Sequence, residues 1–95
     1  MRVLIAEDEY CSRLNLIRQV KECIPFAPEE ILEAENGKEA WEIFLEKRPE
    51  LVLTDIRMPV LTGLELTEMI YKSQIPANVI IVSGFAEFEY AQKAM

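Results

Sequence analysis

Short apolar runs alternate along the chain with longer segments in which apolar residues recur every three or four positions. The short runs have the length of strands and are rich in branched side chains, and they occupy residues 2–6, 31–34, 51–54 and 78–82. The run at 31–34 is the least apolar of the four and is expected nearer an edge of a sheet. The pattern therefore predicts four strands of one sheet with helices between them.

Helical spacing fills the segments between and after these runs. The expected inner faces of the helices are Leu14, Ile17, Val20 and Ile24; Ala40, Ile43 and Phe44; Leu66, Met69 and Ile70; and Phe88, Ala91 and Met95. Arg13 is expected to face away from the first of these stripes, and Thr62 to cap the third helix. Regular alternation of strand and helix predicts one α/β domain over residues 1–95, with a parallel sheet and right-handed crossovers.

Polar residues follow three of the strands at the point where each apolar run stops. Glu7 and Asp8 follow the first, Asp55 follows the third, and Ser83 and Gly84 follow the fourth. Parallel strands end at one edge of their sheet, and open α/β sheets bind their ligands at that edge. We therefore expect these five residues to meet at one site.

This site is expected to hold a divalent cation, because three carboxylates in a small space repel one another unless a cation lies among them. Mg²⁺ prefers carboxylate, carbonyl, water and phosphate oxygens. Asp8 and Asp55 are therefore candidate direct ligands, and Glu7 is a candidate ligand through water. The backbone carbonyl of Arg57 offers a further oxygen.

A carboxylate in such a place can also attack phosphorus and form an acyl phosphate. Asp55 is the candidate nucleophile, and the Ser83 hydroxyl and the Gly84 amide are candidate donors to the phosphoryl oxygens. The side chains of Arg57 and Phe85 are expected to tune the access of water. The same positions also have purely structural readings, namely a turn at Asp55, a helix start at Glu7 and Asp8, a helix cap at Ser83, and ordinary loop side chains at Arg57 and Phe85.

Composition narrows the class of protein. Ten Lys and Arg residues against 17 Asp and Glu residues give a formal net charge of −7, which argues against direct binding to nucleic acid. The chain has no histidine, which excludes a Ser-His or Cys-His nucleophile pair within it.

Cys11 and Cys23 fall on one expected helix, roughly 18 Å apart at about 1.5 Å per residue, so they are expected to be free thiols. The sequence shows no signal peptide and no membrane span, and we expect a cytoplasmic location.

The strand-end residues resemble those of a known family. Glu7-Asp8, Asp55 within L-V-L-T-D-I-R-M-P-V-L-T-G-L-E-L, and Ser83-Gly84 are similar to the motifs of the receiver domain of bacterial two-component response regulators. The resemblance implies a flavodoxin-like three-layer sandwich with strand order 2-1-3-4, phosphorylation of Asp55 by a sensor histidine kinase, Mg²⁺ at the acidic pair, and a Ser83 that reorients toward the phosphoryl group. The segment 83–91 further resembles receivers that precede an AraC-type DNA-binding domain, so DNA would be bound only through such an output domain.

One family feature has no counterpart in the sequence. The family places a lysine after a fifth strand, and Lys93 lies instead in the expected fourth helix. We therefore expect a receiver domain that is incomplete at its C-terminus, without the usual fifth strand and fifth helix. The uncovered edge of the fourth strand is expected to favour a homodimer or a domain-swapped oligomer.

Two other functions are weighed against the leading one. The first is a constitutive dimerisation or interaction module with a non-functional acidic pocket. The second is an aspartyl-nucleophile phosphohydrolase, but haloacid-dehalogenase-like phosphatases need a second Asp two residues after the nucleophile, where this chain has Arg57. We therefore expect a self-phosphorylating and self-dephosphorylating switch rather than a turnover enzyme.

Overall fold

The computed structural model describes residues 1–23 and 30–82. Their order is β1 (Arg2–Ala6), α1 (Tyr10–Cys23), β2 (Glu30–Ala34), α2 (Gly37–Lys47), β3 (Leu51–Asp55), α3 (Gly63–Ser73) and β4 (Asn78–Val82). Each of these elements was expected from the hydrophobic pattern, with ends that agree to within a few residues. The helix expected around Phe88 and Ala91 lies outside the described residues. No helix in the described part of the chain is long and apolar enough to cross a membrane.

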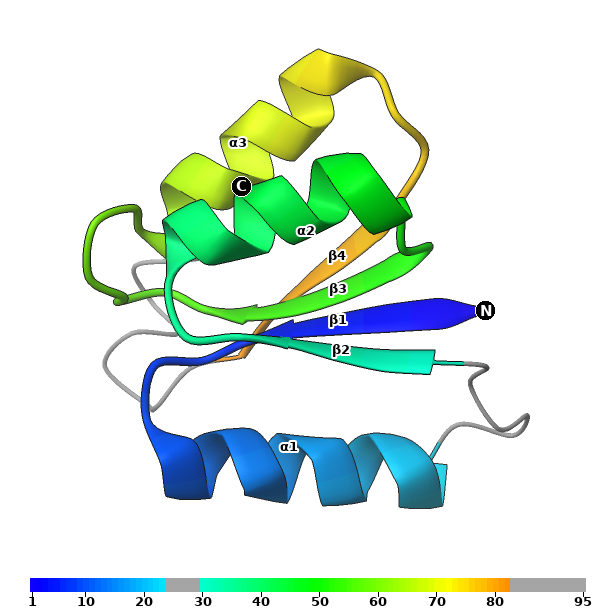
Figure 1. The fold of residues 1–95 in the computed structure, drawn as a ribbon, viewed down its shortest axis with the longest axis vertical. Helices are drawn as coiled ribbons and strands as arrows, with labels where there is room; N and C mark the ends of the chain where they lie inside the picture. Colours follow the sequence, from blue (N-terminus) through cyan, green and yellow to red (C-terminus); the bar gives the residue numbers. More distant parts are fainter. Residues whose placement is uncertain (24–29, 83–95) are drawn as a thin grey trace.

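The four strands form one parallel sheet in the order β2-β1-β3-β4 (Figure 1), which confirms the predicted order. β2 lies at one edge, as its weaker apolar character indicated. Ala6, the last residue of β1, pairs with Ala34 of β2 and Thr54 of β3. This register places Glu7 beside the end of β3, where Asp55 is the last residue.

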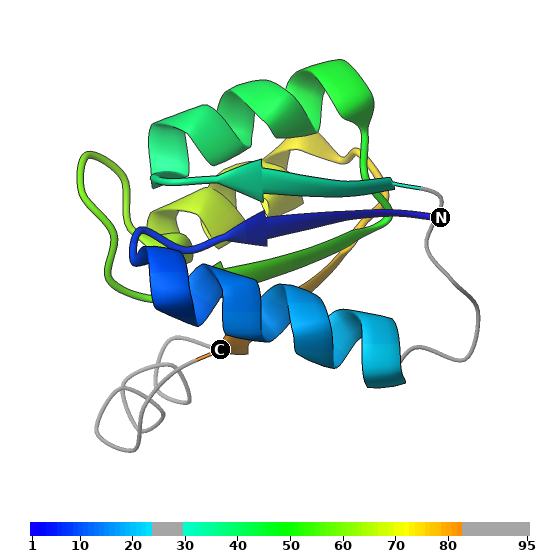
Figure 2. The same ribbon diagram turned by 60° about the horizontal axis from the view of Figure 1, so that its bottom comes forward.

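Helices cover both faces of the sheet and make three layers. α2 and α3 lie on one face and α1 on the other, as Figures 1 and 2 show. Alternate residues of each strand therefore enter two separate cores. The larger core, under α2 and α3, includes Leu4, Ala6, Phe44, Val52, Leu66 and Ile70. The smaller core, against α1, includes Val3, Ile5, Leu16, Val20 and Leu53.

The inner face of α1 differs from the expected one. Leu14 is 43% exposed, whereas Arg13 is only 6% exposed, so the prediction for both residues is wrong. Counted from Arg13, the side chains that meet the sheet are Leu16, Ile17 and Val20, which continue the i, i+3, i+4, i+7 stripe of an amphipathic helix. Arginine can occupy the end of this stripe because its charge and its donors find partners at the ends of β1 and β2.

Side-chain caps fix the starts of the other two helices. Thr62 caps α3 as predicted, and Glu65 returns the hydrogen bond to complete a capping box. Asn36 caps α2, because its Oδ1 accepts a hydrogen bond of 2.8 Å from the Glu39 amide. Both caps satisfy backbone N–H groups that have no partner within the helix.

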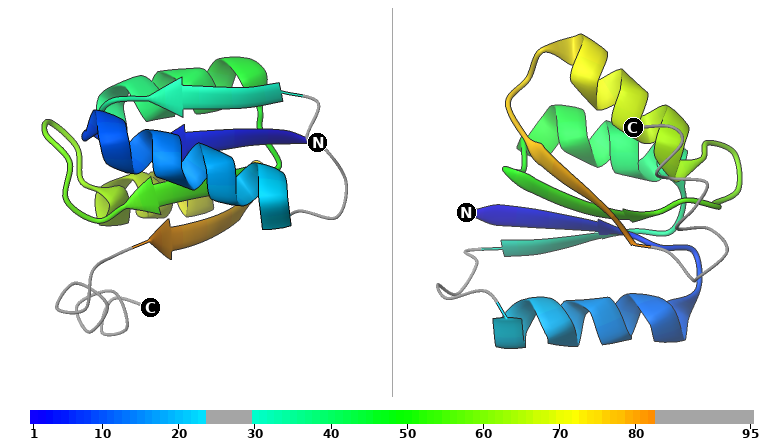
Figure 3. Two further views of the ribbon diagram at one scale, coloured as in Figure 1. Left: turned by 90° about the horizontal axis from the view of Figure 1, so that it is seen from below. Right: turned by 180° about the vertical axis from the view of Figure 1, so that it is seen from behind.

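Two glycines let the segment between β3 and α3 pack closely. A Cβ atom on Gly63 would collide with the carbonyl oxygen of Asp55, and one on Gly37 would collide with that of Leu61. The Gly63 amide also donates a hydrogen bond of 2.7 Å to the Ile56 carbonyl. The start of α3 is therefore seated directly on the backbone at the end of β3. Figure 3 shows this segment and the common direction of the four strands from two further sides.

Candidate functional site

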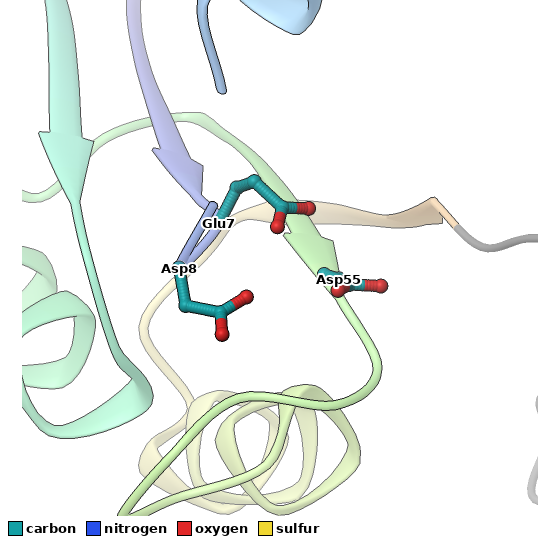
Figure 4. A group of neighbouring side chains, drawn as sticks. All are labelled: Glu7, Asp8 and Asp55. Carbon is teal, nitrogen blue, oxygen red and sulfur yellow. The ribbon is translucent and has the colours of Figure 1, made fainter. Parts of the chain in front are cut away.

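Three carboxylates meet at the carboxyl ends of the two central strands. Glu7 and Asp8 follow β1, and Asp55 ends β3. One carboxylate oxygen from each of the three residues lies within 4.8 Å of the others. Figure 4 shows the three side chains gathered at this end of the sheet. The sequence-based expectation that these acids converge is confirmed by this geometry.

The three acids differ in how far they reach into the protein. Glu7 is 8% exposed, Asp55 is half-buried and Asp8 is exposed. The Glu7 amide donates to the Ala34 carbonyl at 3.0 Å, which extends the pairing of β1 with β2 by one residue. Its Oε1 accepts a hydrogen bond of 3.1 Å from the Glu9 amide. Glu7 thus forms the floor of the site, with Asp8 and Asp55 nearer the solvent.

Burial gives Glu7 an unusual affinity for a proton. Desolvation is the main cause that raises the pKa of Glu7 from its ordinary 4.5 to about 7; the neighbouring Asp55 and Asp8 also raise this pKa, and the hydrogen bond from the Glu9 amide opposes them. Near neutral pH, Glu7 is therefore either protonated and neutral or deprotonated and negatively charged. A cation among the three carboxylates would favour the charged form.

The backbone around Asp55 orients its carboxylate. Asp55 Oδ1 accepts a hydrogen bond of 2.8 Å from the Ile56 amide, and Ile56 is buried. The Thr54 hydroxyl, which is also buried, donates to the Asp55 carbonyl at 2.9 Å. The side chain of Asp55 therefore leaves a rigid strand end while its own carboxylate stays half-exposed and within reach of a reactant.

The donor set fits a hard divalent cation such as Mg²⁺. All the ligand atoms are carboxylate oxygens, which this ion prefers. At about 2.1 Å from the metal, two oxygens on opposite sides of one ion lie about 4.2 Å apart. A group that spans up to 4.8 Å therefore needs either a small inward movement or one ligand that binds through water. Glu7, the most buried of the three, is the candidate for the water-mediated contact.

Comparison with known proteins identifies the family. Residues 3–95 match the response regulator receiver domain. The chain belongs to this family. The predicted resemblance is thereby confirmed, as is the flavodoxin-like arrangement of the sheet.

Similar proteins agree with this assignment. The receiver domain is 37% identical over 94 residues to the uncharacterized transcriptional regulatory protein YesN of Bacillus subtilis, an alignment that covers 99% of this chain and 25% of YesN. It is 38% identical over 92 residues to the transcriptional regulatory protein HptR of Staphylococcus aureus, covering 94% of this chain and 34% of HptR. The chain thus spans a quarter to a third of the length of these curated relatives.

Solved structures show the same fold. The crystal structure of a two component transcriptional regulator AraC from Clostridium phytofermentans superposes with a TM-score of 0.81 at 35% identity, covering 95% of this chain and 72% of that one. The REC domain of AraT from Geobacillus stearothermophilus gives the same TM-score of 0.81 and covers 98% of this chain and 71% of that one. Both neighbours support a receiver domain over the length of this chain.

Of the remaining predicted site residues, only Arg57 lies in the part of the chain that the structure describes. Arg57 lies two residues beyond Asp55 with an exposed side chain, and its role stays a prediction. Ser83, Gly84 and Phe85 lie outside the described residues, as does Lys93, so their predicted roles stay predictions as well.

Sequence reasoning missed two residues that shape the site. Arg13 was taken for a solvent-facing residue, yet its guanidinium contacts the backbone of Glu7. Its place at the head of the stripe with Leu16, Ile17 and Val20 was the available signal. The second is Gly63, because nothing in the sequence alone shows that α3 packs directly against the carbonyl of Asp55.

Proposed function

We propose that this receiver domain accepts a phosphoryl group on Asp55 from a sensor histidine kinase in a Mg²⁺-dependent reaction, and that the modification switches an output activity. The observation that carries the proposal is the gathering of Glu7, Asp8 and Asp55 within 4.8 Å at the end of the central strands. A half-buried, oriented carboxylate next to two further acids suits an acceptor that works with a divalent cation.

Different residues of the chain would have different roles in phosphoryl transfer. An Asp55 oxygen forms the new bond to phosphorus as the bond from phosphorus to the donor nitrogen of the kinase histidine breaks, and the electron pair of that bond stays on the nitrogen. The Ile56 amide holds the Asp55 carboxylate in place during the attack. Asp8 and the Arg57 carbonyl would hold the cation directly with Asp55, and Glu7 would hold it through water.

When bound, Mg²⁺ would neutralise the negative charge shared by the carboxylates and the phosphoryl oxygens. The Ser83 hydroxyl and the Gly84 amide would contact those oxygens, and the side chains of Arg57 and Phe85 would control the approach of water to the acyl phosphate. The domain would therefore act as a switch that is phosphorylated and dephosphorylated, not as a turnover enzyme.

The proposed output is the regulation of transcription in the cytoplasm. The names of YesN, HptR and the Clostridium AraC protein describe transcriptional regulators. The formal net charge of −7 makes this segment unsuited to DNA itself. Contact with DNA would belong to a separate output domain, and the receiver would control it.

Phosphorylation is tested on the protein encoded by the whole reading frame and, in parallel, on residues 1–95. Each is incubated with acetyl phosphate in the presence of Mg²⁺ or EDTA, and the intact mass is recorded before and after hydroxylamine. We expect one hydroxylamine-labile phosphoryl adduct that needs Mg²⁺ and is absent from Asp55→Asn. Glu46→Gln, which removes an exposed carboxylate of α2, should be phosphorylated like the wild type. The absence of any labile adduct on the full-length protein would contradict the proposal.

A further inference from the structure

Arg13 is a charged residue in a buried place. Only 6% of it is exposed, and a guanidinium is rarely buried to this degree without several partners. It lies one turn into α1, on the side of the helix that faces the sheet. Its length and planar donors let it reach past the helix to the ends of two strands.

The guanidinium joins three elements at the edge of the acidic site. Its Nη1 donates a buried hydrogen bond of 2.9 Å to the Glu7 carbonyl. Its Nε donates to Glu33 Oε1 of β2 at 3.0 Å, and its Nη2 lies 3.8 Å from Glu35 Oε1. Its central carbon lies 5.5 Å from the centre of the Tyr10 ring, within range of a cation–π contact.

The contact to the Glu7 carbonyl has a consequence for the site. The Glu7 amide is already bound to the Ala34 carbonyl of β2, so both polar groups of the Glu7 backbone are held. The Glu7 amide belongs to the peptide that joins Ala6 to Glu7, whereas the Glu7 carbonyl belongs to the peptide that joins Glu7 to Asp8. The Glu7–Asp8 peptide therefore cannot turn without breaking the bond from Arg13. Since this peptide sets the directions in which both side chains leave the chain, holding it limits where two of the three carboxylates can lie.

We propose that Arg13 is a positioning residue that sets the affinity of the acidic site for Mg²⁺ by fixing the Glu7–Asp8 peptide through the Glu7 carbonyl. The inference rests on the proposed function, because it takes these carboxylates to be the metal site. Glu33 holds the guanidinium from the other side and offsets its charge, so Arg13 acts through geometry more than through charge. Outer contacts of this kind are worth roughly 10- to 100-fold in metal affinity.

The chain offers a matched control at the other end of the same strands. Arg2 of β1 donates to the Lys47 carbonyl at 2.8 Å and pairs with Glu30 of β2 at 3.4 Å. Arg2 thus makes the same two kinds of contact as Arg13, but at the opposite ends of β1 and β2. Glu30 and Glu33 are also matched, with 45% and 48% of their side chains exposed.

Isothermal titration with Mg²⁺ tests the inference on Arg13→Met, Arg13→Lys and Arg2→Met. The folded fraction of each variant is measured in the same buffer by urea unfolding. We expect both Arg13 variants to bind Mg²⁺ about tenfold more weakly than the wild type or worse, and Arg2→Met to bind within about twofold. Lysine keeps the charge but lacks the planar fork, so wild-type affinity in Arg13→Lys would overturn the geometric role.

Glu33→Ala and Glu30→Ala keep the test decisive if the Arg13 variants fail to fold. Glu33→Ala frees one side of the guanidinium and should weaken Mg²⁺ binding by about threefold or more, whereas Glu30→Ala should not. If the wild type binds Mg²⁺ but Glu33→Ala and Glu30→Ala bind it equally well, the inference about Arg13 is overturned and the proposed function stands. A wild type that binds no Mg²⁺ at millimolar concentration would instead count against the proposed function itself, and the inference would fall with it.

Discussion

The substitution Glu7→Gln should stabilise the metal-free protein at pH 8 and should have a much smaller effect on its stability at pH 5. Glutamine keeps an oxygen that can accept the hydrogen bond from the Glu9 amide, so the change removes mainly the charge. Glu7 is buried, and its pKa is raised to about 7, first by desolvation and then by the charges of Asp55 and Asp8. The carboxylate form of Glu7 is therefore costly to the folded state.

The sign and size of this effect follow from the difference between the pKa of Glu7 in the folded protein and its pKa in the unfolded chain. Below the unfolded pKa of about 4.5 the carboxyl is neutral in both states and contributes nothing. As pH rises from there to 7, the unfolded chain gives up the proton first, so the free energy of unfolding falls; above 7 the cost is complete. The difference of about 2.5 pKa units between 4.5 and about 7 corresponds to about 3 kcal/mol.

Urea unfolding in EDTA, followed by the fluorescence of Trp41, measures this effect. Trp41 stacks on the buried ring of Phe44 with the ring centres 5.8 Å apart, so its emission should report loss of the core. We expect the free energy of unfolding of Glu7→Gln at pH 8 in EDTA to exceed that of the wild type by about 1–3 kcal/mol. We also expect added Mg²⁺ to stabilise the wild type but not this variant. Glu68→Gln is the control, because Glu68 is exposed and its pKa is lowered by Lys72. An equal gain at pH 5 and pH 8, or no gain at pH 8, would refute the reasoning.

Four further substitutions test the scaffold of the site. Gly63→Ala should lower the free energy of unfolding by about 1–3 kcal/mol and also slow phosphorylation, because the added methyl group meets the Asp55 carbonyl. Gly37→Ala should also lower the free energy of unfolding, but with less effect on the rate of phosphorylation. Equal phosphorylation rates in the two variants would contradict the idea that the contact of Gly63 with Asp55 positions the acceptor. Thr62→Ala should cost about 1 kcal/mol in urea unfolding through loss of the α3 cap, and no loss would contradict the capping box. Phe44→Ala should cost about 3–5 kcal/mol because the side chain is fully buried, and a loss below about 1 kcal/mol would mean that the core closes over the gap.

The residues that could be predicted from the sequence are those whose role depends on the regular geometry of a parallel sheet. Apolar runs mark the strands, and parallel strands end at one edge, so Glu7, Asp8 and Asp55 could be brought together without coordinates. The weak apolar character of β2 likewise indicated an edge position. These inferences need only periodicity and the direction of the strands.

The residues that could not be predicted depend on contacts between elements far apart along the chain. The burial of Arg13 depends on Glu33, twenty residues later, and on the backbone of Glu7. A helical pattern alone treats any arginine as solvent-facing, and it therefore placed Leu14 inside by mistake. The closeness of Gly63 to Asp55 depends in the same way on how α3 is seated, which no local preference encodes.

The two arginine–glutamate pairs at the two ends of β2, Arg2–Glu30 from β1 and Arg13–Glu33 from α1, also bear on how the sheet meets other molecules. β2 is an edge strand, and such strands are open to fraying and to pairing with foreign chains. Arg2 with Glu30 closes one end of the β1–β2 pair and Arg13 with Glu33 closes the other. The edge is thus fastened at both ends and carries acidic side chains along its length, which should make it repel a second strand. Arg13, the residue proposed to orient the acidic site, would in this way also protect the protein from aggregation through its pair with Glu33.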